Sequence, residues 1–231
     1  MSGQVRLFAL QYPLVLLAVL GLVRLGWAVT GDWNFVRILS LAEQQHGPLG
    51  EGRNRLLAWQ SLLTEQTGAA EYDQLRAVNT FFNVQLRFED DRSLWGQGDY
   101  WATPVEALRI GGGDCEDYAI AKYITLRRLG ISAEKLRITY VKAIRLNQAH
   151  MVLTYYEQPS AVPVVLDNLV GGILPATQRT DLVPVYAFNG EGLWLPGRSG
   201  DRQVSDSKRL SRWQDLLKKM HKEGFPDDSG S

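Results

Sequence analysis

This sequence of 231 residues contains little cysteine and histidine and has no formal net charge. It contains one cysteine and three histidines, and its 25 basic side chains are balanced by 25 acidic ones. A single cysteine excludes an intramolecular disulfide and the usual zinc sites built from several cysteines. Balanced charge provides no overall field that would favour nucleic acid or an anionic surface. The composition therefore predicts no nucleic-acid-binding function.

Long apolar runs are confined to the N-terminus. Arg6 precedes an uninterrupted apolar run over residues 14–23, and small residues follow. This pattern predicts a secretory signal over residues 1–28, followed by a single domain over residues 29–231. A retained membrane anchor or a buried helix is the alternative, although Arg24 truncates the run. With a signal or an anchor, the remainder of the chain is expected outside the cytoplasm.

The domain itself has the composition of an ordinary globular protein, with 45% hydrophobic and 10% aromatic residues. Three stretches of its first half repeat apolar residues at near-helical spacing: residues 32–46, 54–65 and 70–88. Asp32 is the predicted cap of the first. Thr103, Pro104 and Glu106 form a capping box with proline at the first helical position, which predicts another short helix.

The second half of the domain changes to strand patterning. Four β-branched and aromatic runs are bounded by Asn, Pro and Gly: residues 136–141, 149–156, 162–166 and 183–188. They predict an antiparallel sheet built as a meander, so the fold class is α+β, with helices preceding the sheet. An apolar stripe through Leu210, Trp213 and Met220 predicts a docked terminal helix before a frayed tail.

The one cysteine lies at the end of a triple glycine, within residues 111–117 (GGGDCED). Three glycines allow a sharp turn or a close approach of the backbone. Asp114 is a good helix cap, and the apolar residues that follow predict a buried helix ended by Gly130. Cys115 would occupy its first position, where unpaired N–H groups and the macrodipole favour a thiolate. The alternative is a cysteine that is only a small buried hydrophobe.

One histidine and one aspartate lie where they could serve this thiol. His150 alternates with Val152 within a strand pattern, whereas His46 lies in a turn and His221 in a charged tail. Asp167 ends the next strand, where an adjacent strand could bring its carboxylate beside the imidazole. Taken singly, His150 could be a core residue and Asp167 a turn residue.

Taken together, Cys115, His150 and Asp167 satisfy the requirements of nucleophilic catalysis. A thiol needs a base to accept its proton, and a third group must hold the imidazole in one tautomer. The backbone N–H of Cys115 could also help to hold a developing oxyanion. The loop over residues 95–101, rich in Trp and Tyr, either lines a peptide groove or packs over the core.

Three segments resemble the bacterial transglutaminase-like cysteine proteinases, in particular the LapG-type periplasmic adhesin proteases: residues 111–119 (GGGDCEDYA), 149–156 (AHMVLTYY) and 164–169 (VVLDNL). The likeness extends from about Trp33 to Trp213. It implies a papain-like, transglutaminase-type fold and a calcium-dependent endopeptidase. It also implies cleavage of a large surface adhesin near its N-terminus, at a paired-alanine site, which releases biofilm cells. The implied regulator is the periplasmic domain of an inner-membrane receptor that senses cyclic di-GMP.

The residues around the cysteine give a physical reason for calcium. Asp114, Glu116 and Asp117 place three negative charges around Cys115, which should raise the pKa of its thiol and oppose thiolate formation. A hard cation would reverse this effect, and calcium prefers carboxylate and carbonyl oxygens. We expect calcium beside the helix start, with Asp114 and Asp117 preferred over Glu116 and with carbonyls from a neighbouring loop. Alternatively, Asp114 and Asp117 only cap the helix.

Three other functions stay open at this stage. Acylation of a cysteine is common to hydrolysis and amide transfer, so transglutaminase-type transfer to an amine is the nearest alternative. A non-enzymatic calcium-dependent binding module would use Cys115 only for packing. If the N-terminal helix stays in the membrane, the chain could be an anchored structural subunit, whose membrane contact is made through that segment alone.

Overall fold

The computed structural model describes residues 33–196, 202–205 and 210–226. The chain divides into two units, Met1–Thr30 and Gly31–Ser231, and all described residues belong to the second. The predicted secretory signal over residues 1–28 and the predicted frayed end over residues 227–231 lie outside the described residues. In the described part of the chain, no helix combines the length and the apolar character needed to cross a membrane.

Three helices open the described part of the chain: α1 (Phe35–His46), α2 (Glu51–Gln66) and α3 (Glu71–Gln85). The buried residues of α1 are those that its spacing predicts: Phe35, Ile38, Leu39 and Ala42. Its N-cap is Asn34, whose side chain accepts a hydrogen bond from the Arg37 N–H, while Asp32 lies outside the described residues. Helix α3 ends before the predicted residue 88, because the backbone is already extended at Leu86.

Short elements connect α3 to the helix that carries the cysteine: β1 (Arg87–Phe88), α4 (Asp91–Trp95), α5 (Pro104–Ile110) and β2 (Gly112–Gly113). Strands β1 and β2 pair in parallel, which draws residues 87–88 out of the predicted helix. The capping box of α5 is confirmed: the Thr103 hydroxyl accepts from the Glu106 N–H at 3.0 Å, and the Glu106 carboxylate accepts from the Thr103 N–H at 2.9 Å.

Helix α6 (Cys115–Arg128) runs through the centre of the domain. Every residue from Asp117 to Leu126 is buried, and the helix contacts α3, α5 and β4. Trp59 of α2 donates its indole N–H to the Thr125 hydroxyl at 2.9 Å, so the one polar atom of that buried ring has a partner. Gly130 follows the helix end in the left-handed conformation, with φ of 98°, as predicted.

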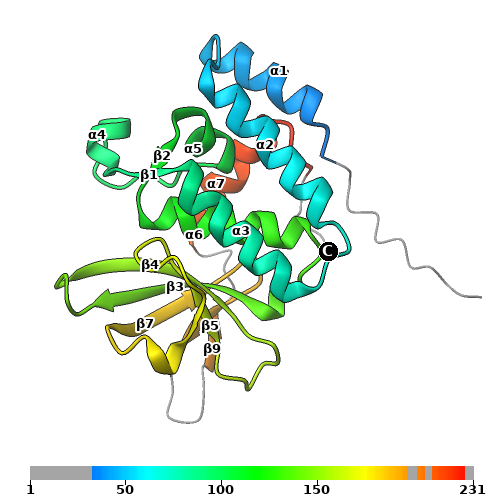
Figure 1. Cartoon of the computed structure of the whole chain (residues 1–231). Coiled ribbons are helices and arrows are strands. Elements are labelled where there is room, and N and C mark those ends of the chain that lie inside the picture. Colours follow the sequence, from blue (N-terminus) through cyan, green and yellow to red (C-terminus); the bar gives the residue numbers. More distant parts are fainter. Residues whose placement is uncertain (1–32, 197–201, 206–209, 227–231) are drawn as a thin grey trace, which may run out of the picture. The chain divides into compact units, whose positions relative to one another are not determined.

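The described residues form one seven-stranded antiparallel sheet in the order β6-β5-β4-β3-β7-β8-β9. Its strands are β3 (Leu136–Ala143), β4 (Gln148–Tyr155), β5 (Val164–Leu166), β6 (Leu174–Pro175), β7 (Leu182–Phe188), β8 (Leu193–Leu195) and β9 (Arg202–Ser205). The prediction of a meander is wrong in one respect, because β7 pairs with β3 and not with the strand before it. Figure 1 shows α3 and α6 along one face of this sheet.

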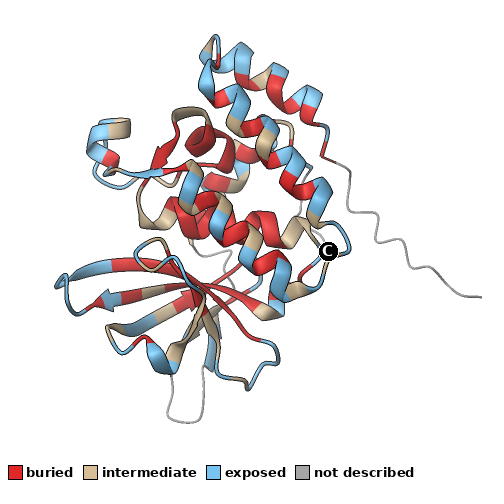
Figure 2. Ribbon diagram, in the orientation of Figure 1, coloured by how far each residue is buried: buried red, intermediate tan, exposed pale blue. Residues whose placement is uncertain are grey.

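The core lies between the helices and this sheet face, and Figure 2 shows buried residues concentrated in α5, α6 and the central strands. Helix α7 (Ser211–Lys222) docks on it, as the apolar stripe predicts. Its buried residues are Trp213, Leu216 and Met220. The Trp213 ring meets Phe188 edge-on at 5.9 Å. A buried side chain of this size contributes about 1.5–3 kcal/mol to folding, so α7 fixes the sheet against the helical layer.

Candidate active site

The triple glycine performs both tasks expected of it. Gly111 ends α5 in the left-handed conformation, with φ of 71°. Gly113 lies against α6, where an added Cβ would come within 2.8 Å of Asp117 side-chain atoms. A side chain at residue 113 would therefore force α6 away from the turn, and the close approach places Cys115 at the first position of α6.

The Cys115 thiol is half-buried and held by its neighbour. It donates a hydrogen bond to a carboxylate oxygen of Glu116 at 3.0 Å. Burial raises the pKa of this thiol well above its usual range, and the negative charges of Glu116 and Asp114 raise it further. The Met151 backbone N–H opposes the rise. The expectation that the helix start alone favours a thiolate is thus wrong for this state, whereas the expected effect of the carboxylates is confirmed.

His150 and Asp167 meet as the strand order predicted. In β4, His150 pairs with Val141 of β3 and shares its sheet face with Val152. Asp167 directly follows β5, which is hydrogen-bonded to β4. The His150 Nε2 and the Asp167 Oδ1 atoms are 2.8 Å apart, and both residues are buried. His46 and His221 are exposed, as expected.

The charge of Asp167 is maintained inside the protein. Burial acts against the ionised form, but bonds from His150, the Leu169 N–H and Arg179 outweigh it and lower the pKa of Asp167 to about 2. The Leu169 N–H donates to Oδ1 at 3.1 Å. A carboxylate that is ionised near neutral pH and lies against Nε2 can hold the imidazole in one orientation.

The cysteine and the histidine approach each other through β4. Helix α6 packs on that strand, and the Met151 N–H that favours the thiolate belongs to the peptide bond following His150. The sulfur is therefore placed beside the stretch of backbone that carries the imidazole. His150 and Asp167 thus contact each other, and the Cys115 sulfur lies beside the backbone that follows His150.

A cluster of carboxylates adjoins the thiol. Oxygen atoms of Asp91, Asp114 and Asp117 lie within 4.8 Å of one another, and those of Asp91, Asp99 and Glu116 form a second such group. Asp91 and Asp99 come from α4 and the loop after it, where we expected only carbonyl ligands. Sequence reasoning missed both residues, although the acidic composition of residues 89–99 was a visible signal.

This cluster fits a hard cation. In the described part of the chain, Asp91 Oδ1 and Asp114 Oδ1 are buried without a hydrogen-bond donor. Burial raises the pKa of Asp114 to about 9, with Glu116 and Asp117 adding to the rise, and burial also raises the pKa values of Asp91 and Asp117. Carboxylate oxygens that lie this close together and lack hydrogen-bond donors are suitable ligands for calcium, which binds oxygen atoms at about 2.3–2.6 Å.

Asp117 also serves the fold, as the capping alternative proposes. Its Oδ1 accepts from the Ala102 N–H at 2.7 Å, and its Oδ2 accepts from the Asp114 N–H at 3.3 Å. Asp117 thus links the helix start to the loop that ends at Ala102. The capping and metal interpretations are compatible for this residue, since each carboxylate oxygen has a second lone pair.

The aromatic loop over residues 95–101 packs over the core in part. Trp101 stacks on Phe188 at 5.4 Å with only 14° between the ring planes, and Trp95 lies 4.6 Å from Tyr100. Trp101 remains half-buried. The loop also adjoins the acidic cluster, because it contains Asp99 and its Tyr100 N–H donates a hydrogen bond to Asp91.

Comparisons with known proteins found one matching family model and several similar solved structures. A family model described as bacterial transglutaminase-like cysteine proteinase matches residues 59–183. A structure of Legionella pneumophila LapG is 44% identical, with a TM-score of 0.67, and the match covers 79% of this chain and 97% of that one. An EGTA-treated structure of it matches with 44% identity, a TM-score of 0.69 and the same coverage. A calcium-bound one matches with 43% identity and a TM-score of 0.68, covering 81% of this chain and 99% of that one. No match was found among curated proteins.

Proposed function

This chain belongs to the bacterial transglutaminase-like cysteine proteinases, and we propose that it is a calcium-dependent periplasmic endopeptidase with Cys115 as its nucleophile. The observation that carries this proposal is the buried 2.8 Å contact between His150 and Asp167, on the strand whose next N–H approaches the Cys115 sulfur. A buried imidazole bonded to an ionised carboxylate beside a thiol is the arrangement of thiol proteases.

The hydrogen bond made by His150 indicates the role of each catalytic residue. Asp167 occupies His150 Nε2, which leaves Nδ1 to accept the thiol proton. The thiolate then attacks the scissile carbonyl, and the imidazolium gives its proton to the leaving amine. Water hydrolyses the resulting thioester with His150 as general base, and this step restores the thiol. The Cys115 backbone N–H is at the first position of the helix, where an N–H has no intrahelical partner, and it can hold the oxyanion.

Calcium would be held by the carboxylates next to the thiol. The candidate ligands are the three predicted residues and the two that the structure adds: Asp114, Glu116, Asp117, Asp91 and Asp99. When bound, the ion supplies positive charge that offsets these carboxylates. Glu116 connects the two sites, because it belongs to the cluster and also accepts the thiol hydrogen bond. Calcium-bound and EGTA-treated forms of the similar Legionella protein support calcium as the ion.

The proposed substrate is a large surface adhesin, cut near its N-terminus so that biofilm cells are released. The proposed regulator is the periplasmic domain of an inner-membrane receptor for cyclic di-GMP. Family membership and the similarity to LapG over nearly the whole of that protein support both proposals. Export from the cytoplasm is proposed from the apolar pattern of residues 1–28, and the periplasm is proposed from the resemblance to the LapG-type proteases.

The test is incubation of the wild type and of Cys115→Ala with an adhesin N-terminal fragment, with calcium or with a chelator. We expect cleavage only by the wild type with calcium, and restored cleavage when calcium is added back. Equal cleavage by both proteins would refute Cys115 as the nucleophile. Adding a primary amine separates hydrolysis from acyl transfer, because an amine-linked product in place of free acid would identify a transglutaminase.

A further inference from the structure

Both oxygens of the Asp167 carboxylate lie close to a partner. Oδ1 lies 2.8 Å from His150 Nε2 and accepts a hydrogen bond from the Leu169 N–H at 3.1 Å. Oδ2 forms an ion pair with Arg179 Nη2 at 2.7 Å. Asn83 of α3 holds the Asp167 backbone carbonyl at 2.8 Å. The orientation of this carboxylate, and with it that of the imidazole, therefore depends on what fixes Arg179.

Arg179 is itself locked in place. It follows the short 3₁₀ turn Ala176–Gln178, and its guanidinium binds Asp181 through two parallel bonds of 3.0 and 2.9 Å. The residue is only 4% exposed. A planar guanidinium with a bidentate partner has little freedom to rotate. Its Nη2 atom, which makes one of the two bonds to Asp181, is therefore held beside Asp167 Oδ2.

We propose that Arg179 is a positioning residue of the catalytic site, which acts through Asp167 to hold His150 in the orientation and tautomer needed by Cys115. The proposal rests on the function proposed above and adds a fourth residue to it. Arg179 lies between Asp181 and Asp167 in a chain of contacts that ends at His150, and it supplies the charge that offsets a carboxylate taken out of water.

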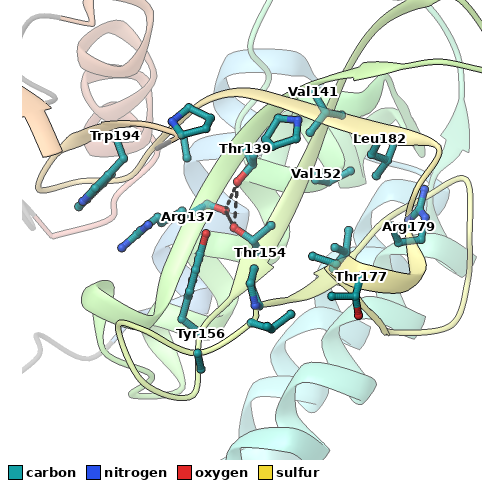
Figure 3. A pocket seen from close by; sticks show the side chains of 18 of the residues that line it. Arg137, Thr139, Val141, Val152, Thr154, Tyr156, Thr177, Arg179, Leu182 and Trp194 are labelled. Carbon is teal, nitrogen blue, oxygen red and sulfur yellow. Dashed lines mark hydrogen bonds between the residues drawn. The ribbon is translucent and has the colours of Figure 1, made fainter. Parts of the chain in front are cut away.

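A cavity beside Arg179 makes it possible to distinguish a positioning role from a purely structural one. Arg179 lines a cavity of about 670 Å³ on the sheet face that carries Val141 and Val152. Figure 3 shows Arg179 at one end of this cavity, near Leu182. Removing its side chain would therefore open the Asp167 carboxylate to the cavity, where a small cation could enter and replace the guanidinium.

The experiment measures kcat and KM on the adhesin fragment for the wild type, Arg179→Ala and Arg179→Lys, with calcium present. We expect Arg179→Ala to lose about 10- to 100-fold in kcat, with KM little changed. Losses of this size are typical when a residue that orients a metal ligand by a hydrogen bond is removed, and we expect the same for a residue that orients a catalytic carboxylate. Methylguanidinium should restore part of the lost kcat, whereas methylammonium at the same concentration should not. Arg179→Lys should be intermediate, because it keeps the charge and loses the fork. Arg53→Ala, which breaks an exposed ion pair with Glu43, is the matched control.

An NMR measurement tests the same inference without any substrate. The chain has three histidines, so the ring nitrogens of His150 can be assigned in long-range ¹H–¹⁵N spectra against exposed His46 and His221. The wild type should show a single Nε2–H tautomer, and Arg179→Ala a mixture. If the wild type cleaves no adhesin but the two proteins still differ in tautomer as expected, the proposed function is wrong and the inferred role of Arg179 is retained.

Two results would overturn the inference. One is a folded Arg179→Ala with wild-type kcat and tautomer. The other is a lowered kcat that methylguanidinium does not restore while the tautomer is unchanged, which would make Arg179 a structural residue. If Arg179→Ala does not fold, Arg179→Lys and Asp181→Asn replace it. Both should lower kcat and mix the tautomers to a smaller extent, and wild-type values in both would equally overturn the inference.

Discussion

Replacing Glu116 by Gln should make the Cys115 thiol of the calcium-free protein more reactive. In the wild type this thiol donates to the Glu116 carboxylate at 3.0 Å, and burial together with that carboxylate raises its pKa. The substitution removes the charge and keeps an amide oxygen as acceptor. Burial and Asp114 continue to act, so the variant should recover only part of an ordinary thiol's reactivity.

The size of the effect follows from the contact. Two unit charges about 4 Å apart interact by about 4 kcal/mol at an effective dielectric constant near 20. Both Cys115 and Glu116 are partly exposed, and solvent screening reduces the figure to roughly 1–3 kcal/mol. Since about 1.4 kcal/mol is a tenfold change in the thiolate fraction, we expect iodoacetamide to alkylate Glu116→Gln about 10- to 100-fold faster near neutral pH.

The assay follows alkylation of Cys115 by mass spectrometry, in chelator and in calcium. The chain's one cysteine makes the signal unambiguous. Calcium should accelerate the wild type strongly and Glu116→Gln weakly, because the variant has already lost the opposing charge. Glu65→Gln, at an exposed position on α2, is the control and should match the wild type. Equal rates for the wild type and Glu116→Gln under both conditions would refute the electrostatic reasoning.

Two further predictions concern other buried carboxylates. Asp91→Asn and Asp114→Asn should each weaken calcium binding in calorimetry at least tenfold, since each removes a charged oxygen without a donor, and unchanged affinity in both would remove these residues from the site. Burial raises the pKa of Glu223 to about 8, so the folded state retains a proton that the unfolded chain releases near its ordinary value. The free energy of unfolding should thus fall as pH rises from about 5 to about 8. Melting curves recorded at these two pH values should show a smaller loss of stability in Glu223→Gln than in the wild type. An identical loss in both proteins would contradict the shift.

Local signals in the sequence predicted most of the elements that position the site. The capping box at Thr103 and the glycines before Cys115 act within a few residues, so their effect is readable from spacing. The pairing of β7 with β3 was not predictable in this way, because it is a contact between strands distant along the chain. The alternation of His150 with Val152 was readable, since it is a property of one strand.

The remaining parts of the site depend on tertiary burial. The helix-start argument for a Cys115 thiolate is local, but burial beside Glu116 reverses it, and burial is known only once α6 is packed. Asp91 lies far from Cys115 in the sequence and reaches it through α4 and the loop after it. Arg179 lies in a turn without a motif, and only the fold brings it to Asp167.

The central claim is that the sulfur of Cys115 and the free ring nitrogen of His150 meet, and the most direct test is their separation in a crystal structure of the calcium-loaded protein. We predict Sγ and Nδ1 within about 4 Å, with Nε2 still bonded to Asp167. An imidazole turned away from Cys115, at a distance that no rotamer of either side chain can close, would contradict the account.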